Sequence, residues 1–139
     1  MQIAVVGGGE CRPEVSEMAC LLGRLLAEKG HVLICGGLGG VMEAACRGAK
    51  KAGGLTLGIL PGEMGSANEF VDIAIATGMG HARNAIIAKS ADAVIALPGE
   101  LGYPRHDKGE KSRGGYKALG LGFAEIFGGI MLEKVVIFE

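Results

Sequence analysis

The chain has 139 residues, of which 49% are apolar, and its formal net charge is −1 at pH 7. This length is typical of one domain with a single core, and the apolar content excludes a disordered chain. No apolar run reaches the roughly 20 residues that cross a bilayer, and no secretory leader is recognisable, so we expect a cytoplasmic protein. The balanced charge predicts no nucleic-acid partner and no membrane partner.

Short apolar runs alternate with helical patterns along the first 97 residues. Helices are predicted to begin at Pro13 and Val41, to end at Gly30 and Gly53, and to cover residues 80–90. The predicted strands are residues 2–6, 31–35, 55–60, 70–76 and 93–97. This alternation predicts an α/β fold, a doubly wound parallel sheet in three α/β/α layers, and a single domain over residues 1–139.

The pattern changes after Gly99. Residues 100–117 are rich in charge and lack apolar periodicity, which predicts a charged loop. Residues 116–127 predict a last helix, and residues 135–138 predict a final strand.

The cysteines are spaced irregularly and form no C-x-x-C pair. They are Cys11, Cys20, Cys35 and Cys46. A zinc site or a redox pair needs closer clustering, so we expect reduced, mostly buried thiols and no metal site.

Glycine is the compositional outlier, with 26 residues that cluster after the predicted strands. In an open parallel sheet, ligands bind beyond the carboxyl ends of the strands, where these clusters lie. A glycine turn lets a phosphate approach the backbone, and the following helix adds free N–H donors and the positive end of its dipole. The predicted phosphate or ribose site comprises Gly8, Gly9, Gly36, Gly37, Gly39, Gly40, Met42 and Glu43. The alternative is that these glycines only form tight turns.

Two better-known phosphate-binding patterns do not occur in this sequence. Arg12 stands where the third glycine of a G-x-G-x-x-G fingerprint would follow Gly7 and Gly9, and neither glycine cluster is followed by the lysine of a P-loop. The sequence therefore favours neither a hydride-transferring dehydrogenase nor a P-loop nucleotide hydrolase.

The third predicted helix brings charged and polar candidates to the same edge. Arg83 follows Gly78 and Gly80 at the start of that helix, where the dipole does not favour a cation, so we expect Arg83 to contact an anionic ligand. Asn84 either caps the helix or binds the ligand. Glu43, in the first turn of the second helix, either complements that helix's dipole or contacts the ligand.

Several ordered stretches of this sequence resemble the Lonely Guy superfamily. The matching stretches are residues 36–45, 48–50, 53–62, 78–84 and 90–99. Within the superfamily, the chain looks like the small prokaryotic proteins related to the molybdenum cofactor carrier and, more distantly, to the DNA-processing protein DprA. The resemblance covers residues 1–99.

The resemblance implies a Rossmann-like fold and a homodimer or higher homo-oligomer. Lonely Guy enzymes are phosphoribohydrolases, which cut the N-glycosidic bond of a nucleoside 5′-monophosphate, and the arginine that matches Arg83 belongs to their catalytic site. The resemblance implies no required cofactor. The implied partner is a small phosphate-bearing molecule, either a nucleoside monophosphate or a molybdopterin-like ligand.

The superfamily motif P-G-G-x-G-T-x-x-E supplies a phosphate cradle, a hydroxyl group and a catalytic glutamate. Pro98, Gly99 and Gly102 match this motif and join the predicted ligand-binding residues. Three positions differ from it: the chain has Glu100, Tyr103 and His106 where the motif has glycine, threonine and glutamate.

We therefore expect a protein that binds a nucleotide or a phosphorylated cofactor without strong catalytic activity. The alternative is a phosphoribohydrolase in which Arg83 is catalytic and Glu100 or His106 substitutes for the missing glutamate. The abrupt departure from the motif has two alternative explanations, namely divergence to a non-catalytic binder or a change of reading frame after about Gly99.

Overall fold

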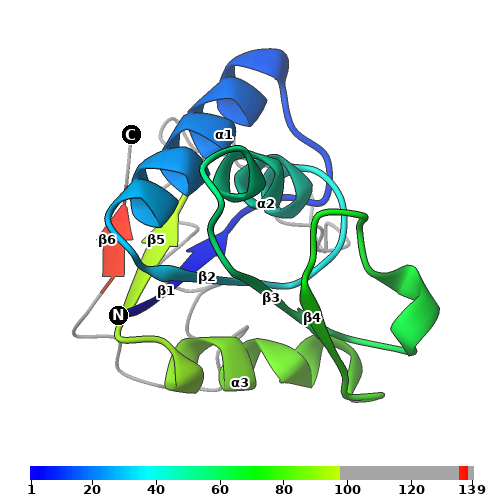
Figure 1. The fold of residues 1–139 in the computed structure, drawn as a ribbon. Helices are drawn as coiled ribbons and strands as arrows, with labels where there is room; N and C mark the ends of the chain where they lie inside the picture. Colours follow the sequence, from blue (N-terminus) through cyan, green and yellow to red (C-terminus); the bar gives the residue numbers. More distant parts are fainter. Residues whose placement is uncertain (98–134, 138–139) are drawn as a thin grey trace, which may run out of the picture.

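The computed structural model describes residues 1–97 and the short strand 135–137, and the structural statements below concern these residues. The strands form one parallel six-stranded sheet in the order β4-β3-β2-β1-β5-β6 (Figure 1). They are β1 (Gln2–Val6), β2 (Val32–Cys35), β3 (Thr56–Leu60), β4 (Ile73–Ala76), β5 (Ala93–Ala96) and β6 (Val135–Ile137).

Helices cover both faces of the sheet. Helices α1 (Pro13–Glu28) and α2 (Val41–Lys51) lie on one face, and α3 (Arg83–Ser90) lies on the other (Figure 1). The sheet grows outward from β1 in both directions, toward β2 and toward β5. The fold is a Rossmann-like α/β domain with three layers, as the sequence predicted.

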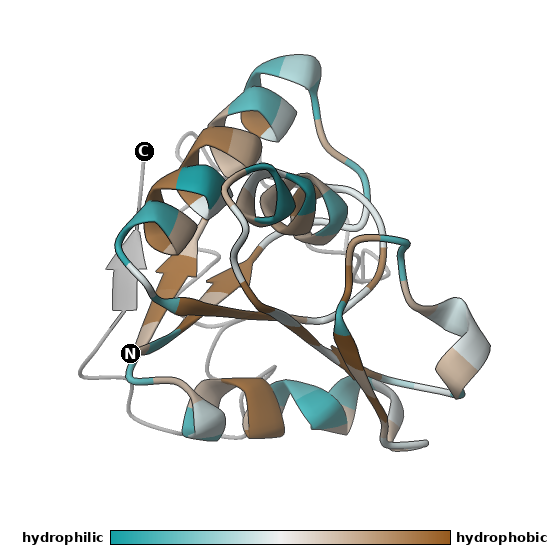
Figure 2. Ribbon diagram, viewed as in Figure 1, coloured by the Kyte–Doolittle hydropathy of each residue, from teal (hydrophilic) through white to brown (hydrophobic). Residues whose placement is uncertain are grey.

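Each central strand contributes apolar side chains to both faces. In β2, Leu33 and Cys35 pack on the side of α1 and α2, whereas Ile34 packs on the side of α3. This division follows from the two-residue period of a strand, and Figure 2 shows β1 to β5 as mostly apolar. Complete burial of a side chain as large as Leu33 or Ile34 contributes about 1.5–3 kcal/mol.

Helices α1 and α2 pack with their backbones in close approach. A Cβ atom on Gly23 of α1 would overlap the carbonyl oxygen of Ala45, and one on Gly48 of α2 would overlap the carbonyl oxygen of Cys20. These two glycines therefore set the spacing of the helix pair, and any side chain there would push α2 away from α1.

Two predicted elements begin three residues later than the sequence indicated, whereas β2 and β3 begin one residue later. The strand predicted over residues 70–76 begins at Ile73, because the carbonyl of Phe70 accepts a hydrogen bond from the Thr56 hydroxyl at 2.6 Å instead of joining the ladder. The helix predicted over residues 80–90 starts with a 3₁₀ turn, Gly80–Ala82, so that Arg83 is its first α-helical residue.

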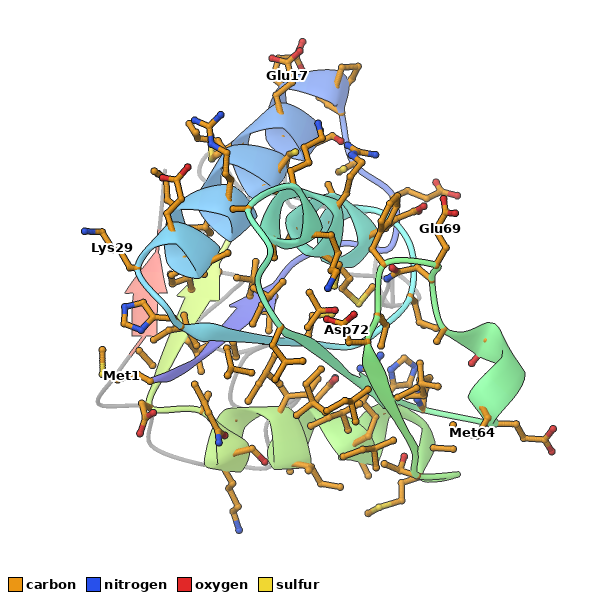
Figure 3. The ribbon with its side chains drawn as sticks, in the orientation of Figure 1. Met1, Glu17, Lys29, Met64, Glu69 and Asp72 are labelled. Atoms are coloured by element: carbon orange, nitrogen blue, oxygen red, sulfur yellow. The ribbon has the colours of Figure 1, made fainter. Side chains whose placement is uncertain are left out.

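The apolar stripe of α1 is wider than the face that packs on the sheet. Met18 is 37% exposed and Leu25 is 41% exposed, although both have the helical spacing of core residues, and Leu21 beside them is also exposed. In Figure 3 the labelled Glu17 and Lys29 also point away from the sheet. Part of the predicted helical stripe therefore faces outward.

Several predicted features lie outside the described residues. These include the charged loop over 100–117 and the last helix over 116–127. The predicted final strand is present as β6, which pairs with β5 in parallel. Among the helices that the structure describes, none combines the length and apolar character needed to span a membrane.

Asp72 ties three elements together at the amino edge of the sheet, where Figure 3 labels it. Its carboxylate accepts hydrogen bonds from Lys50 Nζ at 2.8 Å, from the Thr56 N–H at 3.0 Å and from the Thr56 hydroxyl at 3.2 Å. Burial raises the pKa of Asp72, but the donors on Lys50 and Thr56 outweigh burial, so the pKa lies below its usual value.

Asp72→Asn is expected to lower the free energy of unfolding by about 1 kcal/mol near neutral pH. Because the folded pKa of Asp72 is lowered, its contribution is present above the unfolded value of about 3.9 and is lost as the pH falls through the folded value. Urea denaturation at about pH 7 and about pH 3 measures this change. A difference between variant and wild type that stays the same at both pH values would contradict the role of Asp72.

Candidate functional site

Two glycine loops meet at the carboxyl edge of the sheet. Residues 7–9 follow β1, and residues 36–40 follow β2 and lead into α2. Strand β1 lies between β2 and β5, so the loop after β1 borders the point where the order of the strands reverses. In open parallel sheets, that crevice is where ligands bind.

The N-terminus of α2 lies directly against the loop after β1. The Val41 N–H donates a hydrogen bond to the Gly8 carbonyl at 3.0 Å. Gly40, the N-cap of α2, has a φ of 63°, and a Cβ there would lie 2.6 Å from the Gly9 carbonyl oxygen. Only glycine fits this position, because any side chain would face both a strained backbone and a steric clash.

Several amide donors at this junction have no acceptor within the described part of the chain. They belong to Gly39, Gly40, Met42 and Glu43. The first N–H groups of a helix have no partner inside it, and the dipole of the 11-residue α2 places partial positive charge at the same point. This arrangement suits a phosphate or another anion.

Arg83 brings a buried positive charge to the end of β2. The residue is only 8% exposed, its Nη2 donates to the Gly36 carbonyl at 3.4 Å, and its Nη1 donates to the Asn84 side-chain oxygen. Its Nε has no hydrogen-bond partner among the described residues, and no described carboxylate forms an ion pair with it. Burial lowers the pKa of the Arg83 guanidinium, an effect that nearby Cys35 partly opposes.

Gly36 leaves the space that Arg83 and Met42 occupy. A Cβ on Gly36 would lie 2.6 Å from Met42 Sδ and 2.7 Å from Arg83 Nη2. The side chains of Met42 on α2 and Arg83 on α3 therefore converge on the same glycine from two different helices.

A pair of buried thiols lies behind the glycine loop. Cys35 Sγ and Cys46 Sγ are 3.4 Å apart, and the Gly37 N–H donates to Cys35 Sγ at 3.3 Å. The hydrogen bond from Cys46, together with the Gly37 amide and the charge of Arg83, lowers the pKa of Cys35 although burial raises it. The same hydrogen bond, with burial, raises the pKa of Cys46. All four cysteines are free thiols; Cys35 and Cys46 are buried, whereas Cys11 and Cys20 are partly exposed, so fewer are buried than the sequence predicted.

Glu43 lies at the rim of the junction between the two loops. It is half-buried in the first turn of α2, and its Oε2 lies 3.9 Å from the position that a Cβ on Gly39 would take. The same Cβ position lies 3.3 Å from the Gly9 carbonyl oxygen, and Gly9 itself is exposed with open space in front of it.

The structure brings together most of the residues that the sequence singled out. Gly8, Gly9, Gly39, Gly40 and Glu43 form one junction. A second group lies around the end of β2 and comprises Gly36, Gly37, Met42, Arg83 and Asn84. Asn84 does not cap the helix; its side-chain oxygen accepts a hydrogen bond from Arg83. Pro98, Gly99, Glu100, Gly102 and His106 lie outside the described residues.

Sequence reasoning missed Asn68. This residue lies in the connection between β3 and β4 and forms hydrogen bonds with the glycine loop 30 and 31 positions earlier. A lone asparagine in a loop carries no local signal, because its partners are set by the fold. In the described part of the chain, no group of three or more His, Cys, Asp or Glu residues is placed to hold a metal ion.

Comparisons with known proteins agree with the fold. A protein of Archaeoglobus fulgidus is 58% identical over 102 residues, which are 73% of this chain and 68% of the relative. The solved molybdenum cofactor binding protein of Rippkaea orientalis is 36% identical, with a TM-score of 0.73, over 99% of this chain and 88% of that one. The solved structure of TM1055 is 34% identical, with a TM-score of 0.65, over 70% of this chain but only 61% of that one.

DNA processing protein A of Helicobacter pylori shares the fold alone. It is 21% identical over 74% of this chain and 56% of that chain, with a TM-score of 0.57. The expected distant resemblance to DprA is therefore a resemblance of fold.

A family model identifies the branch of these proteins to which the chain belongs. The model matches residues 1–104, so it includes both glycine loops and Arg83 and ends close to the point where the sequence leaves the superfamily motif. The chain belongs to the SLOG cluster4 family, a branch of the Lonely-Guy-like superfamily.

Proposed function

We propose that this chain binds a nucleotide or a phosphorylated cofactor at the carboxyl edge of its sheet, without strong catalytic activity. The observation that carries the proposal is the buried guanidinium of Arg83, which has an unpaired Nε and no acidic partner among the described residues. Burial of a charge that lacks an opposite charge costs several kcal/mol, and the phosphate of a bound ligand would supply an opposite charge to Arg83.

The unpaired amides at the start of α2 support the same proposal. They lie at the same edge of the sheet as Arg83, and Gly36 and Met42 connect the two groups. A phosphate monoester can accept hydrogen bonds from both an arginine and several backbone amides, and such charge-assisted bonds are stronger than neutral ones. A phosphorylated ligand would therefore satisfy the donors that have no partner within residues 1–97.

The ligand class includes nucleoside monophosphates and molybdopterin-like compounds, since both carry a phosphate monoester. The relative in Rippkaea orientalis is a molybdenum cofactor binding protein, which supports the second of these for this chain. The phosphoribohydrolase remains the competing function, because Arg83 occupies the place of the superfamily's catalytic arginine.

We also propose that the protein acts in the cytoplasm and binds no nucleic acid. Four free thiols suit a reducing compartment, and the nearly balanced charge gives no electrostatic reason to bind a polyanion.

A homodimer or higher homo-oligomer belongs to the same proposal. Met18, Leu21 and Leu25 form an exposed apolar stripe on α1 that a second copy would cover.

Thermal unfolding with a panel of nucleoside monophosphates, in wild type and Arg83→Met, tests the binding and the chemistry together. Wild type is expected to gain about 2.7 kcal/mol at about 100 times Kd, with no release of free base. Arg83→Met should lose this gain, yet the free variant should be at least as stable as wild type because it removes a buried charge that has no acidic partner among the described residues. Arg24→Ala, on the exposed side of α1, is the control.

The outcomes of that experiment separate the candidate functions. Free base released by wild type, and not by Arg83→Met, would assign the chain as a phosphoribohydrolase. An Arg83→Met variant that keeps the full ligand-induced gain would contradict the anion site at Arg83.

Gly36→Ala is expected to weaken binding of the same ligand by about 2 kcal/mol without removing any charge. The added Cβ would lie 2.7 Å from Arg83 Nη2, so the guanidinium must move away from its position. Titration calorimetry with AMP measures the effect. Gly65→Ala is the matched control, because nothing lies within 4 Å of its Cβ position, and equal affinities for the two variants would count against the geometry proposed for Arg83.

Leu21→Glu is expected to shift the protein toward the mass of a single 14.2 kDa chain, because a charge cannot be buried without a partner in an apolar interface. Light scattering coupled to size-exclusion chromatography measures the mass. A wild type that is already monomeric would overturn the proposed homo-oligomer, and a variant with unchanged oligomeric mass would place the interface elsewhere.

A further inference from the structure

Asn68 joins the connection between β3 and β4 to the glycine loop after β2. Its backbone N–H donates to the Gly37 carbonyl at 2.8 Å, and its side-chain Nδ2 donates to the Leu38 carbonyl at 2.8 Å and to the Gly37 carbonyl at 3.3 Å. Its Oδ1 accepts the Phe70 N–H at 3.0 Å. Both Nδ2 and Oδ1 of this half-buried side chain therefore form hydrogen bonds, and both acceptors of Nδ2 are carbonyls of the glycine loop. In Figure 3 the labelled Glu69, the next residue, marks this segment.

These hydrogen bonds fix the direction of two peptide groups. In a planar trans peptide, the carbonyl of one residue and the N–H of the next point in opposite directions. Because Asn68 holds the carbonyls of Gly37 and Leu38, it turns the N–H groups of Leu38 and Gly39 away from itself. The Gly39 N–H is one of the amides that has no acceptor within the described residues.

The first amide of the loop is held separately. The Gly37 N–H donates to Cys35 Sγ at 3.3 Å, so it is not available to a ligand. The second thiol, Cys46, lies 3.4 Å from Cys35 Sγ behind the loop. The loop is thus held from behind by one amide side chain and by the thiol pair, and its later amides remain on the opposite side.

We propose that Asn68 is a positioning residue that orients the Leu38 and Gly39 amides toward the phosphate of the bound ligand. This inference rests on the proposed function, because it assigns part of the anion site to a residue that does not touch the anion. Pre-oriented donors bind an anion more tightly than donors that must first reorganise, because the ordering has already taken place in the free protein.

Asn68→Asp separates this role from a role in the loop's own stability. Aspartate keeps the oxygen that accepts the Phe70 N–H, but it replaces the Nδ2 donor with an oxygen that repels the Gly37 and Leu38 carbonyls. Asn68→Ala removes the donor without adding charge. Ser66→Ala is the control, since the Ser66 hydroxyl donates to the Glu63 carbonyl in the same connection and does not reach the glycine loop.

The experiment combines AMP titration with amide NMR of the free proteins. We expect AMP affinity to fall about tenfold in both Asn68 variants and to stay unchanged in Ser66→Ala. We also expect the Leu38 and Gly39 amide resonances to move in both Asn68 variants when no ligand is present. If Asn68→Ala does not fold, Asn68→Asp still tests the proposal, since aspartate has the size of asparagine and keeps the contact with the Phe70 N–H.

The two measurements distinguish failure of this inference from failure of the proposed function. Unmoved Leu38 and Gly39 amides, or AMP affinities equal to wild type in both Asn68 variants, would overturn the positioning role. A wild type that binds neither AMP nor inorganic phosphate would overturn the anion site itself, and with it the assignment of Asn68 to that site, whatever the amide resonances show.

Discussion

The site depends on one close contact, in which the N-terminus of α2 lies on the loop after β1 with no side chain between them. The Val41 N–H donates to the Gly8 carbonyl, and Gly40 meets the backbone of Gly9. This contact fixes where α2 begins and places its first amides, which have no acceptor in the described part of the chain, at the edge of the sheet. On the other side of α2, Gly23 and Gly48 let α1 come equally close, so the helix is held along its length.

Burial of the Arg83 charge lowers the free energy of unfolding at this edge of the sheet. The buried Arg83 guanidinium has no acidic partner among the described residues, and the phosphate of a bound ligand would offset the cost of burying its charge. Sites of this kind trade stability for function, because the same charge that weakens the free protein strengthens its complex. Asn68 and the Cys35–Cys46 pair add no charge to the surface but keep the glycine loop in one shape.

Most of the fold could be predicted from the sequence because its signals are local. Strands such as β2 are short apolar runs, helices such as α1 begin at a proline, and glycines end both kinds of element. One boundary error occurred where a side chain distant in sequence replaced a backbone partner. Phe70 leaves the ladder of β4 because the hydroxyl of Thr56, 14 positions earlier, binds its carbonyl.

The sequence by itself determined the alternation of strands and helices, the glycine loops at the carboxyl edge, and the placement of Arg83 at the start of a helix near them. Periodicity and glycine spacing are enough for these features, because they reflect geometry within one element or one turn. Only the tertiary structure decided that Arg83 is buried with no partner for its Nε among the described residues, that Met42 meets it over Gly36, and that Asn68 holds the glycine loop. Those contacts join residues about 30 to 50 positions apart, and packing of the whole sheet, not local preference, brings them together.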